Sequence, residues 1–110
     1  MLANILLIDD ENSLRELLAR LIRLEGFEVV QAASLSAARQ ALAKSRPEIV
    51  LCDVKLPDGN GVEFVGELKA GYPDIEIALL TAYGNIPDGV QAMRTGAFDY
   101  LVKGDDNNKI

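Results

Sequence analysis

Short apolar runs alternate with segments of helical periodicity along the chain. Three of the runs, ILLI at 5–8, IVLC at 49–52 and IALL at 77–80, are apolar on both faces, which is typical of strands in the centre of a parallel sheet. Between the runs, apolar residues recur every three or four positions, as in Leu14, Leu17, Leu18, Leu21 and Ile22. This alternation predicts βαβ units and a parallel sheet.

The predicted helices are bounded by residues that typically begin and end helices. Gly26 follows the first helix, Ser34 opens the second, and Gly71 and Pro73 end the third. A fourth helix, with few large apolar residues, is predicted over residues 85–95. The helices therefore connect one strand to the next, as a doubly wound sheet requires.

The order of the strands follows from their polarity. The runs FEVVQ at 27–31 and DYLVK at 99–103 are more polar than the others and predict edge strands. Five parallel strands in the order 2-1-3-4-5, numbered along the chain, satisfy this pattern in a doubly wound, flavodoxin-like α/β fold. Ligands in such sheets bind at the carboxyl ends of the strands, beside the point between strands one and three where the chain switches direction.

Composition limits the class of protein. The 110 residues carry a net charge of −6 and are 49% hydrophobic, which predicts one globular domain over residues 1–110 that does not itself bind nucleic acid. No apolar run is long enough to span a membrane and no secretory signal is evident, so we expect a cytoplasmic protein. The absence of histidine excludes His-dependent hydrolases, and the single cysteine, Cys52, is interpreted as a small buried side chain.

Polar residues gather where the predicted strands end. Asp9 and Asp10 follow the first strand, Asp53 ends the third, Thr81 the fourth and Lys103 the fifth. Three carboxylates at one edge of a sheet repel one another unless a cation lies among them, and Mg²⁺ is a hard ion that prefers oxygen ligands. A lysine and a hydroxyl facing this metal suit a phosphoryl group, with Asp53 as the nucleophile that would become an aspartyl phosphate.

Each of these residues also has an ordinary structural role. Asp9 and Asp10 would cap the first helix, Thr81 would be a strand-end hydroxyl, and Lys103 would be a solvated charge. The segment DVKLPDG at 53–59 would be only a turn. The coincidence of all these residues at one end of one sheet favours a functional site.

Four segments resemble a response-regulator receiver domain of the chemotaxis (CheY-like) type: LIDDE at 7–11, DVKLPDGNG at 53–61, LTAYG at 80–84 and GAFDYLVK at 96–103. The stretch 81–103 is most similar to receivers of nitrogen-regulator (NtrC-like) transcription activators. The resemblance implies a two-component switch that accepts a phosphoryl group from a histidine kinase. The surface of the fourth helix and fifth strand would then change. This change would control an output domain or partner protein that regulates transcription. The domain would catalyse only its own phosphorylation and dephosphorylation, and would not be an enzyme for an external substrate.

The same resemblance assigns roles to individual residues. Asp53 would be the phosphoacceptor, Thr81 would hydrogen-bond the phosphoryl group, Lys103 would pair with it, and Tyr100 would be the switch aromatic. The implied magnesium ligands are three carboxylates and one backbone carbonyl, from Asp9, Asp10, Asp53 and Lys55 respectively.

Two features depart from the family pattern. Gly104 stands where the family usually has proline after the lysine, and only residues 104–110 follow where the family has a fifth helix. We therefore expect the fifth helix to be missing or truncated. A longer natural chain or a homodimer would then cover the face beside the first helix.

Three other functions fit only parts of this pattern. A phosphatase or mutase of the haloacid dehalogenase type would need an aspartate where Lys55 stands. A flavin or dinucleotide binder would need a first turn rich in glycine or hydroxyls, and the acidic turn at 9–11 would repel phosphate. A docking module without phosphorylation would have no need of the intact acidic set together with Thr81 and Lys103.

Overall fold

Strands and helices alternate along the chain in the computed structural model, which describes residues 3–81, 94, 96–97 and 99–102. The elements are β1 (Asn4–Ile8), α1 (Asn12–Leu24), β2 (Glu28–Ala32), α2 (Leu35–Lys44), β3 (Ile49–Asp53), β4 (Lys55–Leu56), β5 (Gly59–Asn60), α3 (Gly61–Gly71), β6 (Glu76–Thr81) and β7 (Asp99–Val102). Among these residues, no helix combines the length and apolarity needed to cross a membrane.

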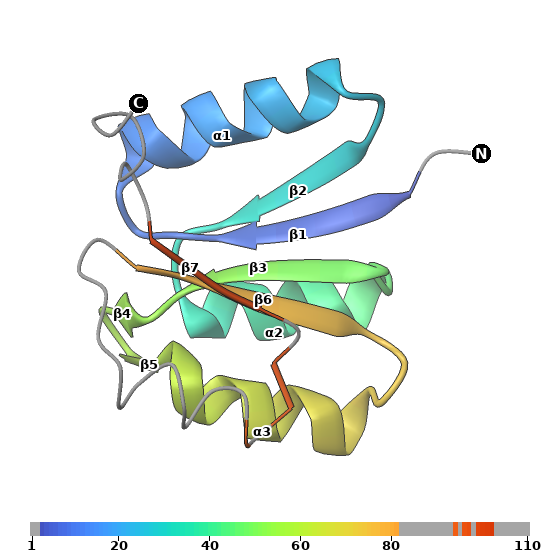
Figure 1. The fold of residues 1–110 in the computed structure, drawn as a ribbon, viewed down its shortest axis with the longest axis vertical. Coiled ribbons are helices and arrows are strands. Elements are labelled where there is room, and N and C mark those ends of the chain that lie inside the picture. The colour runs from blue at the N-terminus through green and yellow to red at the C-terminus, as the bar shows by residue number, and fades with distance from the viewer. Residues whose placement is uncertain (1–2, 82–93, 95, 98, 103–110) are drawn as a thin grey trace.

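The main sheet is parallel and has the order β2-β1-β3-β6-β7 (Figure 1). The parallel core and the order of β2, β1, β3 and β6 confirm the prediction, and β7 pairs with β6 where the fifth strand was expected. Of the predicted helix at 85–95 the structure describes only residue 94, which is helical, and the missing or truncated fifth helix falls outside the described residues. Three whole helices occur within the described part of the chain.

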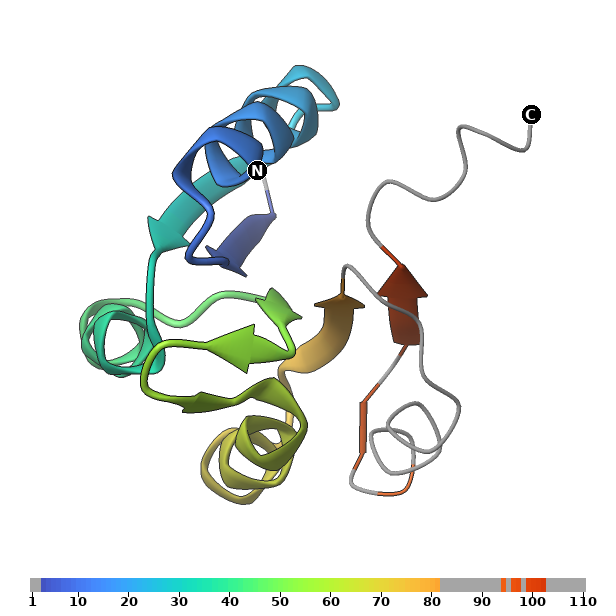
Figure 2. The same ribbon diagram turned by 90° about the vertical axis from the view of Figure 1, so that its left-hand side faces the viewer.

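Helices cover both faces of the sheet, with α1 on one side and α2 and α3 on the other (Figure 2). The α2/α3 side holds the larger core, built on alternate strand residues such as Leu6, Val50 and Ile77 and closed by Phe64. The α1 side is smaller, with Leu7 and Leu80 among its buried residues. Strands buried on both faces are apolar throughout, which is why their sequence runs were recognisable.

The ends of the helices follow the local chemistry. Gly26 has a φ of +100° just after α1, and its N–H donates to the Arg23 carbonyl, so it is the terminating glycine that the sequence predicted. Ser34 caps α2, and its hydroxyl oxygen accepts a hydrogen bond of 3.1 Å from the Ala37 N–H.

A two-stranded antiparallel hairpin of β4 and β5 follows β3, in a segment for which the sequence predicted only a turn-rich loop. Its strands are too short to carry a period-2 pattern, so hydrophobic alternation could not reveal it. The hairpin lies at the carboxyl ends of the main strands.

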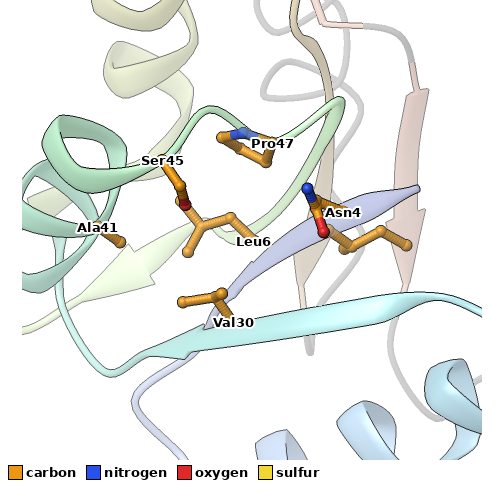
Figure 3. A pocket seen from close by; sticks show the side chains of 7 residues that line it. Asn4, Leu6, Val30, Ala41, Ser45 and Pro47 are labelled. Carbon is orange, nitrogen blue, oxygen red and sulfur yellow. The ribbon is translucent and has the colours of Figure 1, made fainter. Parts of the chain in front are cut away.

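A shallow pocket lies at the opposite, amino ends of the strands (Figure 3). Its lining comes from β1, β2, α2 and the α2–β3 connection, and includes Asn4, Leu6, Val30, Ala41, Ser45 and Pro47. None of the predicted site residues lines it.

Candidate functional site

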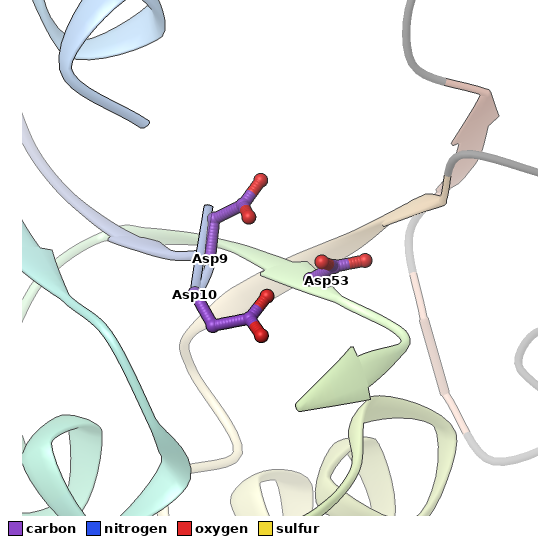
Figure 4. A group of neighbouring side chains, drawn as sticks. All are labelled: Asp9, Asp10 and Asp53. Atoms are coloured by element: carbon purple, nitrogen blue, oxygen red, sulfur yellow. The ribbon is translucent and has the colours of Figure 1, made fainter. Parts of the chain in front are cut away.

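Three aspartates meet at the carboxyl ends of β1 and β3 (Figure 4). Asp9, Asp10 and Asp53 each offer a carboxylate oxygen, and these oxygens all lie within 4.8 Å of one another. Asp9 is completely buried, Asp53 is 7% exposed and Asp10 is exposed. The cluster therefore has two buried carboxylates and one that faces solvent.

The register of the sheet brings these residues together. Ile8 of β1 is aligned with Cys52 of β3, so Asp9, just past β1, and Asp53, the last residue of β3, lie side by side. Strand β2 lies on one side of β1, and the later strands β3 and β6 lie on the other side. The chain therefore switches direction between β1 and β3, and the acidic cluster lies at this switch point.

Hydrogen bonds hold both the backbone and the side chain of Asp9. Its N–H donates to the Ala32 carbonyl at 3.0 Å, and its Oδ1 accepts from the Glu11 N–H at 2.9 Å. Its carbonyl oxygen accepts from Arg15 Nη1 at 2.8 Å. The capping interpretation of Asp9 and Asp10 is wrong, because Glu11 is the N-cap residue of α1 and no side-chain cap bond forms there.

Asp53 is held by the strand on one side and by the loop on the other. The N–H of Val54 donates to the Leu80 carbonyl at 3.0 Å, and the Val54 carbonyl accepts from the Gly61 N–H at 2.7 Å. Lys55 begins β4 two residues after Asp53. This backbone path fixes where Asp53 and the peptide groups after it lie relative to β1.

A second aspartate in the same loop ties the hairpin to α2. Asp58 Oδ1 and Oδ2 accept hydrogen bonds of 2.9 Å from the N–H groups of Leu35 and Ser36, the first residues of α2. These bonds, chiefly the one from Leu35, lower the pKa of the Asp58 carboxyl. Asp58 therefore acts as a carboxylate at a helix N-terminus, where negative charge is favoured.

The thiol of Cys52, beside the acidic cluster, lies in an environment that disfavours its ionised form, in contrast to the carboxylate of Asp58. Cys52 is completely buried, and its Sγ donates to the Asp53 carbonyl at 3.2 Å. Burial, reinforced by the charges of Asp53 and Asp9, raises the pKa of this thiol. Cys52 is thus a neutral core side chain, as its sequence context predicted.

The predicted site residues fall into two groups. Asp9, Asp10 and Asp53 are brought together, and Lys55 lies in the adjoining hairpin. Thr81 ends β6, the strand next to β3, and Tyr100 lies in β7, while their side chains and the whole of Lys103 lie outside the described part of the chain.

Sequence reasoning missed Arg15, Gln31 and Asp58. Arg15 lies on α1 among other charged residues, a pattern typical of a solvated helix face. Its partner Gln31 lies on a strand 16 residues further along the chain. Asp58 contacts a helix that begins 23 residues earlier. No local signal distinguishes these side chains from solvated ones, because their partners come from other elements.

The arrangement suits a hard divalent cation. Three carboxylates converge at the switch point of a doubly wound sheet, which is the place where such sheets bind ligands. Oxygen donors of this kind match the preferences of Mg²⁺ and Ca²⁺. The fold and the acidic cluster together define an α/β protein with a candidate cation site at the carboxyl ends of its strands.

Residues 5–110 match the response regulator receiver domain, and the chain belongs to that family. It is 41% identical over 103 residues to the response regulator protein FleR of Pseudomonas aeruginosa, a match that covers 94% of this chain and 22% of FleR. It is 39% identical over 103 residues to the transcriptional regulatory protein ZraR of Escherichia coli, covering 91% of this chain and 23% of ZraR. The chain thus spans less than a quarter of the length of these relatives, which are response regulators of the NtrC type.

Two solved receiver structures have the same fold. One is a response regulator from Burkholderia pseudomallei with a phosphorylated aspartic acid, a calcium ion and citrate, at a TM-score of 0.88 and 31% identity, covering 97% of this chain and 63% of that one. The other is the beryllofluoride-activated NtrC4 receiver domain dimer, at a TM-score of 0.88 and 28% identity, covering 96% and 88%. The CheY-like receiver fold expected from the sequence is confirmed.

Proposed function

We propose that this domain is a phosphorylation switch in which a histidine kinase transfers a phosphoryl group to Asp53. The observation that carries the proposal is the convergence of the Asp9, Asp10 and Asp53 carboxylates within 4.8 Å, with Asp53 in the middle of the sheet. The solved relative that contains a phosphorylated aspartic acid supports the same chemistry on the same fold.

The transfer is a displacement at phosphorus. An oxygen of the Asp53 carboxylate forms a bond to phosphorus as the P–N bond of the kinase phosphohistidine breaks, and the electron pair of that bond returns to the imidazole. The product is an acyl phosphate on Asp53 and a neutral histidine on the kinase after proton uptake. The domain's own part is to hold Asp53 in place and to stabilise charge on the phosphoryl oxygens.

Magnesium is the proposed cofactor of this step. The carboxylates of Asp9, Asp10 and Asp53 and the backbone carbonyl of Lys55 would hold the ion. Bound Mg²⁺ would neutralise negative charge on the transferred phosphoryl group. The calcium ion in the phosphorylated relative supports a divalent cation at this kind of site.

Three further residues complete the proposed switch. Thr81 at the end of β6 would hydrogen-bond the phosphoryl group, and Lys103, one residue past β7, would form an ion pair with it. Tyr100 of β7 would change its position as Thr81 moves, and this would alter the surface that partners read. These roles are carried by the family resemblance and by the positions of the strands.

The proposed output is transcription, through an output domain or a partner protein. The relatives FleR and ZraR, of which this chain matches about a fifth, support a regulatory output of this kind. The NtrC4 receiver dimer supports a homodimer as one form of the switched state. We propose a cytoplasmic receiver that acts on no external substrate and contacts neither membrane nor nucleic acid directly.

Labelling with acetyl phosphate tests the proposal. We expect the wild-type chain, incubated with acetyl phosphate and Mg²⁺, to gain the mass of one phosphoryl group on the peptide that contains Asp53, and to gain none when Mg²⁺ is chelated. Asp53→Asn, which is nearly isosteric, should fold normally and gain no label. Asp58→Asn changes an aspartate of the same loop and should still be labelled. Label on the Asp53→Asn variant, or none on the wild type, would overturn the assignment.

A further inference from the structure

We propose that Arg15 is a positioning residue for the acidic site: its guanidinium holds the backbone carbonyl of Asp9, and so sets the directions in which Asp9 and Asp10 present their carboxylates to a divalent cation. The inference rests on the proposed function, because it assigns Arg15 a part in cation binding at that site. It concerns geometry and does not make Arg15 a ligand.

The guanidinium of Arg15 joins three elements. Nη1 donates to the Asp9 carbonyl and to Asn12 Oδ1, both at 2.8 Å, and Nε donates to Gln31 Oε1 at 2.9 Å. These acceptors belong to the turn after β1, the first residue of α1 and strand β2. A planar guanidinium with fixed donor directions can satisfy three such acceptors at once, which a single ammonium group cannot do with the same geometry.

The Asp9 carbonyl controls the direction of Asp10. The peptide plane that contains this carbonyl also contains the Asp10 N–H, so rotating the plane swings the Asp10 side chain relative to Asp9. The Asp9 N–H and carboxylate are already bonded to Ala32 and Glu11. Arg15 therefore holds the group that fixes the two aspartates relative to each other.

The role of Arg15 is one of orientation. Its three acceptors are neutral oxygens, so none of these contacts depends on pairing with an opposite charge. Replacing arginine by lysine keeps the positive charge near the acidic turn and removes the planar fork. This substitution separates the geometric contribution from the electrostatic one.

The same helix offers a matched control. Arg23 also donates from its guanidinium to a backbone carbonyl of β2, with Nη2 at 3.0 Å from the Val29 oxygen. That contact lies at the far end of α1 from the acidic turn. Arg15→Lys and Arg23→Lys therefore disturb the same kind of bond, but only the first lies beside the aspartates.

Calorimetric titration of the 110-residue chain with Mg²⁺ tests the inference. We expect Arg15→Lys to weaken Mg²⁺ binding by about tenfold, the lower end of the range for residues that orient metal ligands, and Arg23→Lys to bind as the wild type does. Urea unfolding in chelator should show that both variants fold, with Arg15→Lys the less stable, because Arg15 makes three side-chain hydrogen bonds and Arg23 makes one. Wild-type affinity in Arg15→Lys would overturn the inference and leave the proposed function intact, whereas a wild type that binds no Mg²⁺ would overturn both.

A second variant keeps Arg15 and removes one of its acceptors. Gln31→Met deletes the oxygen that accepts from Nε, and should weaken Mg²⁺ binding in the same direction but by less. The double variant of Arg15→Lys and Gln31→Met should bind as weakly as Arg15→Lys alone, because both changes release the same clamp. Losses that multiply would show that the two residues act separately, and would overturn the clamp.

Discussion

A side chain on Gly61 would collide with the backbone carbonyl of Asp53, the proposed phosphoacceptor. Gly61 is the first residue of α3, and its N–H donates to the Val54 carbonyl, so the helix start packs directly on the end of β3. The φ of Gly61 is not positive, so backbone conformation does not require glycine here. The requirement comes from the close approach of the two backbones, which leaves no room for a Cβ.

We expect Gly61→Ala to lower the free energy of unfolding by about 1–3 kcal/mol, the usual cost of forcing atoms into a packed site. Gly66 lies in the same helix, and a Cβ added there would have no neighbouring atom within 4 Å, so it is the matched control. Gly66→Ala should stabilise the chain by about 0.5–1 kcal/mol, because alanine favours helix more than glycine does. Urea denaturation of both variants measures the difference, and equal effects would contradict the packing argument.

Removing one of the three carboxylates should raise the stability of the chain when magnesium is absent and reduce the stabilisation that magnesium provides when it is present. In chelator, we expect Asp10→Asn to raise the free energy of unfolding by about 1 kcal/mol, since two charges 4 Å apart repel by about that much in a watery environment. Millimolar Mg²⁺ should raise the Tm of the wild type, because a ligand of the folded state stabilises it, and should raise that of the variant much less. Asp74→Asn changes an exposed aspartate away from the cluster and should show neither effect. Thermal melts that rank the variants the same way in both buffers would argue against the cluster as a cation site.

The carboxylate of Asp58 should make stability depend on pH in the acidic range. Its pKa is lowered by the N–H groups of Leu35 and Ser36, so the ionised form stabilises the fold above the ordinary value of about 3.9. That contribution is lost as the pH falls through the lower, folded-state value. Wild type should therefore be more stable than Asp58→Asn near neutral pH, and the gap should close below about pH 4. Urea unfolding at a series of pH values measures the gap, and a constant gap would contradict the capping role.

The acidic cluster could be predicted from the sequence because parallel strands end at the same edge. Asp9, Asp10 and Asp53 each follow an apolar run, and the order of those runs places them at the switch point. The strands themselves could be predicted because β1, β3 and β6 are buried on both faces, and each therefore contains an apolar run of four residues.

The contacts that hold the cluster in place could not be predicted. The Arg15–Gln31 bond and the bonds from Asp58 to α2 join elements far apart in the sequence, through polar side chains that look the same when they are solvated. Helix α1 begins after Glu11 and has no side-chain cap. The backbone of Asp9 is hydrogen-bonded to Ala32 and Arg15, which lie outside the turn, so residues 9–11 alone could not show where the helix begins. Local patterns report burial well and report polar partners poorly.

Helix α1 presents an apolar stripe that should make the isolated chain bind other apolar surfaces. Leu17, Leu21 and Leu24 lie at spacings of four and three residues and are 46%, 50% and 75% exposed. We expect the chain to bind the dye ANS or to self-associate, and Leu21→Gln with Leu24→Gln to reduce both. Because these side chains are largely exposed, each change should alter the free energy of unfolding by no more than about 0.5 kcal/mol. Sedimentation and dye fluorescence are the measurements, and a monomeric wild type that binds no dye would contradict the prediction.

Cys52 should report the opening of the site itself. Its thiol is completely buried in β3 next to Asp53, and its pKa is raised, so a thiol reagent at neutral pH should find neither access nor thiolate in the folded chain. Labelling then requires opening of β3, and we expect it to be at least about 10³-fold slower than for the unfolded chain, in keeping with the small unfolded fraction of a stable domain. Mg²⁺ should slow it further by favouring the closed state, while Asp53→Asn should label at a rate that Mg²⁺ changes little. Rapid labelling of the native chain would show that the end of β3 opens without the rest of the sheet. It would contradict the prediction that Cys52 becomes accessible only when the fold around the site opens.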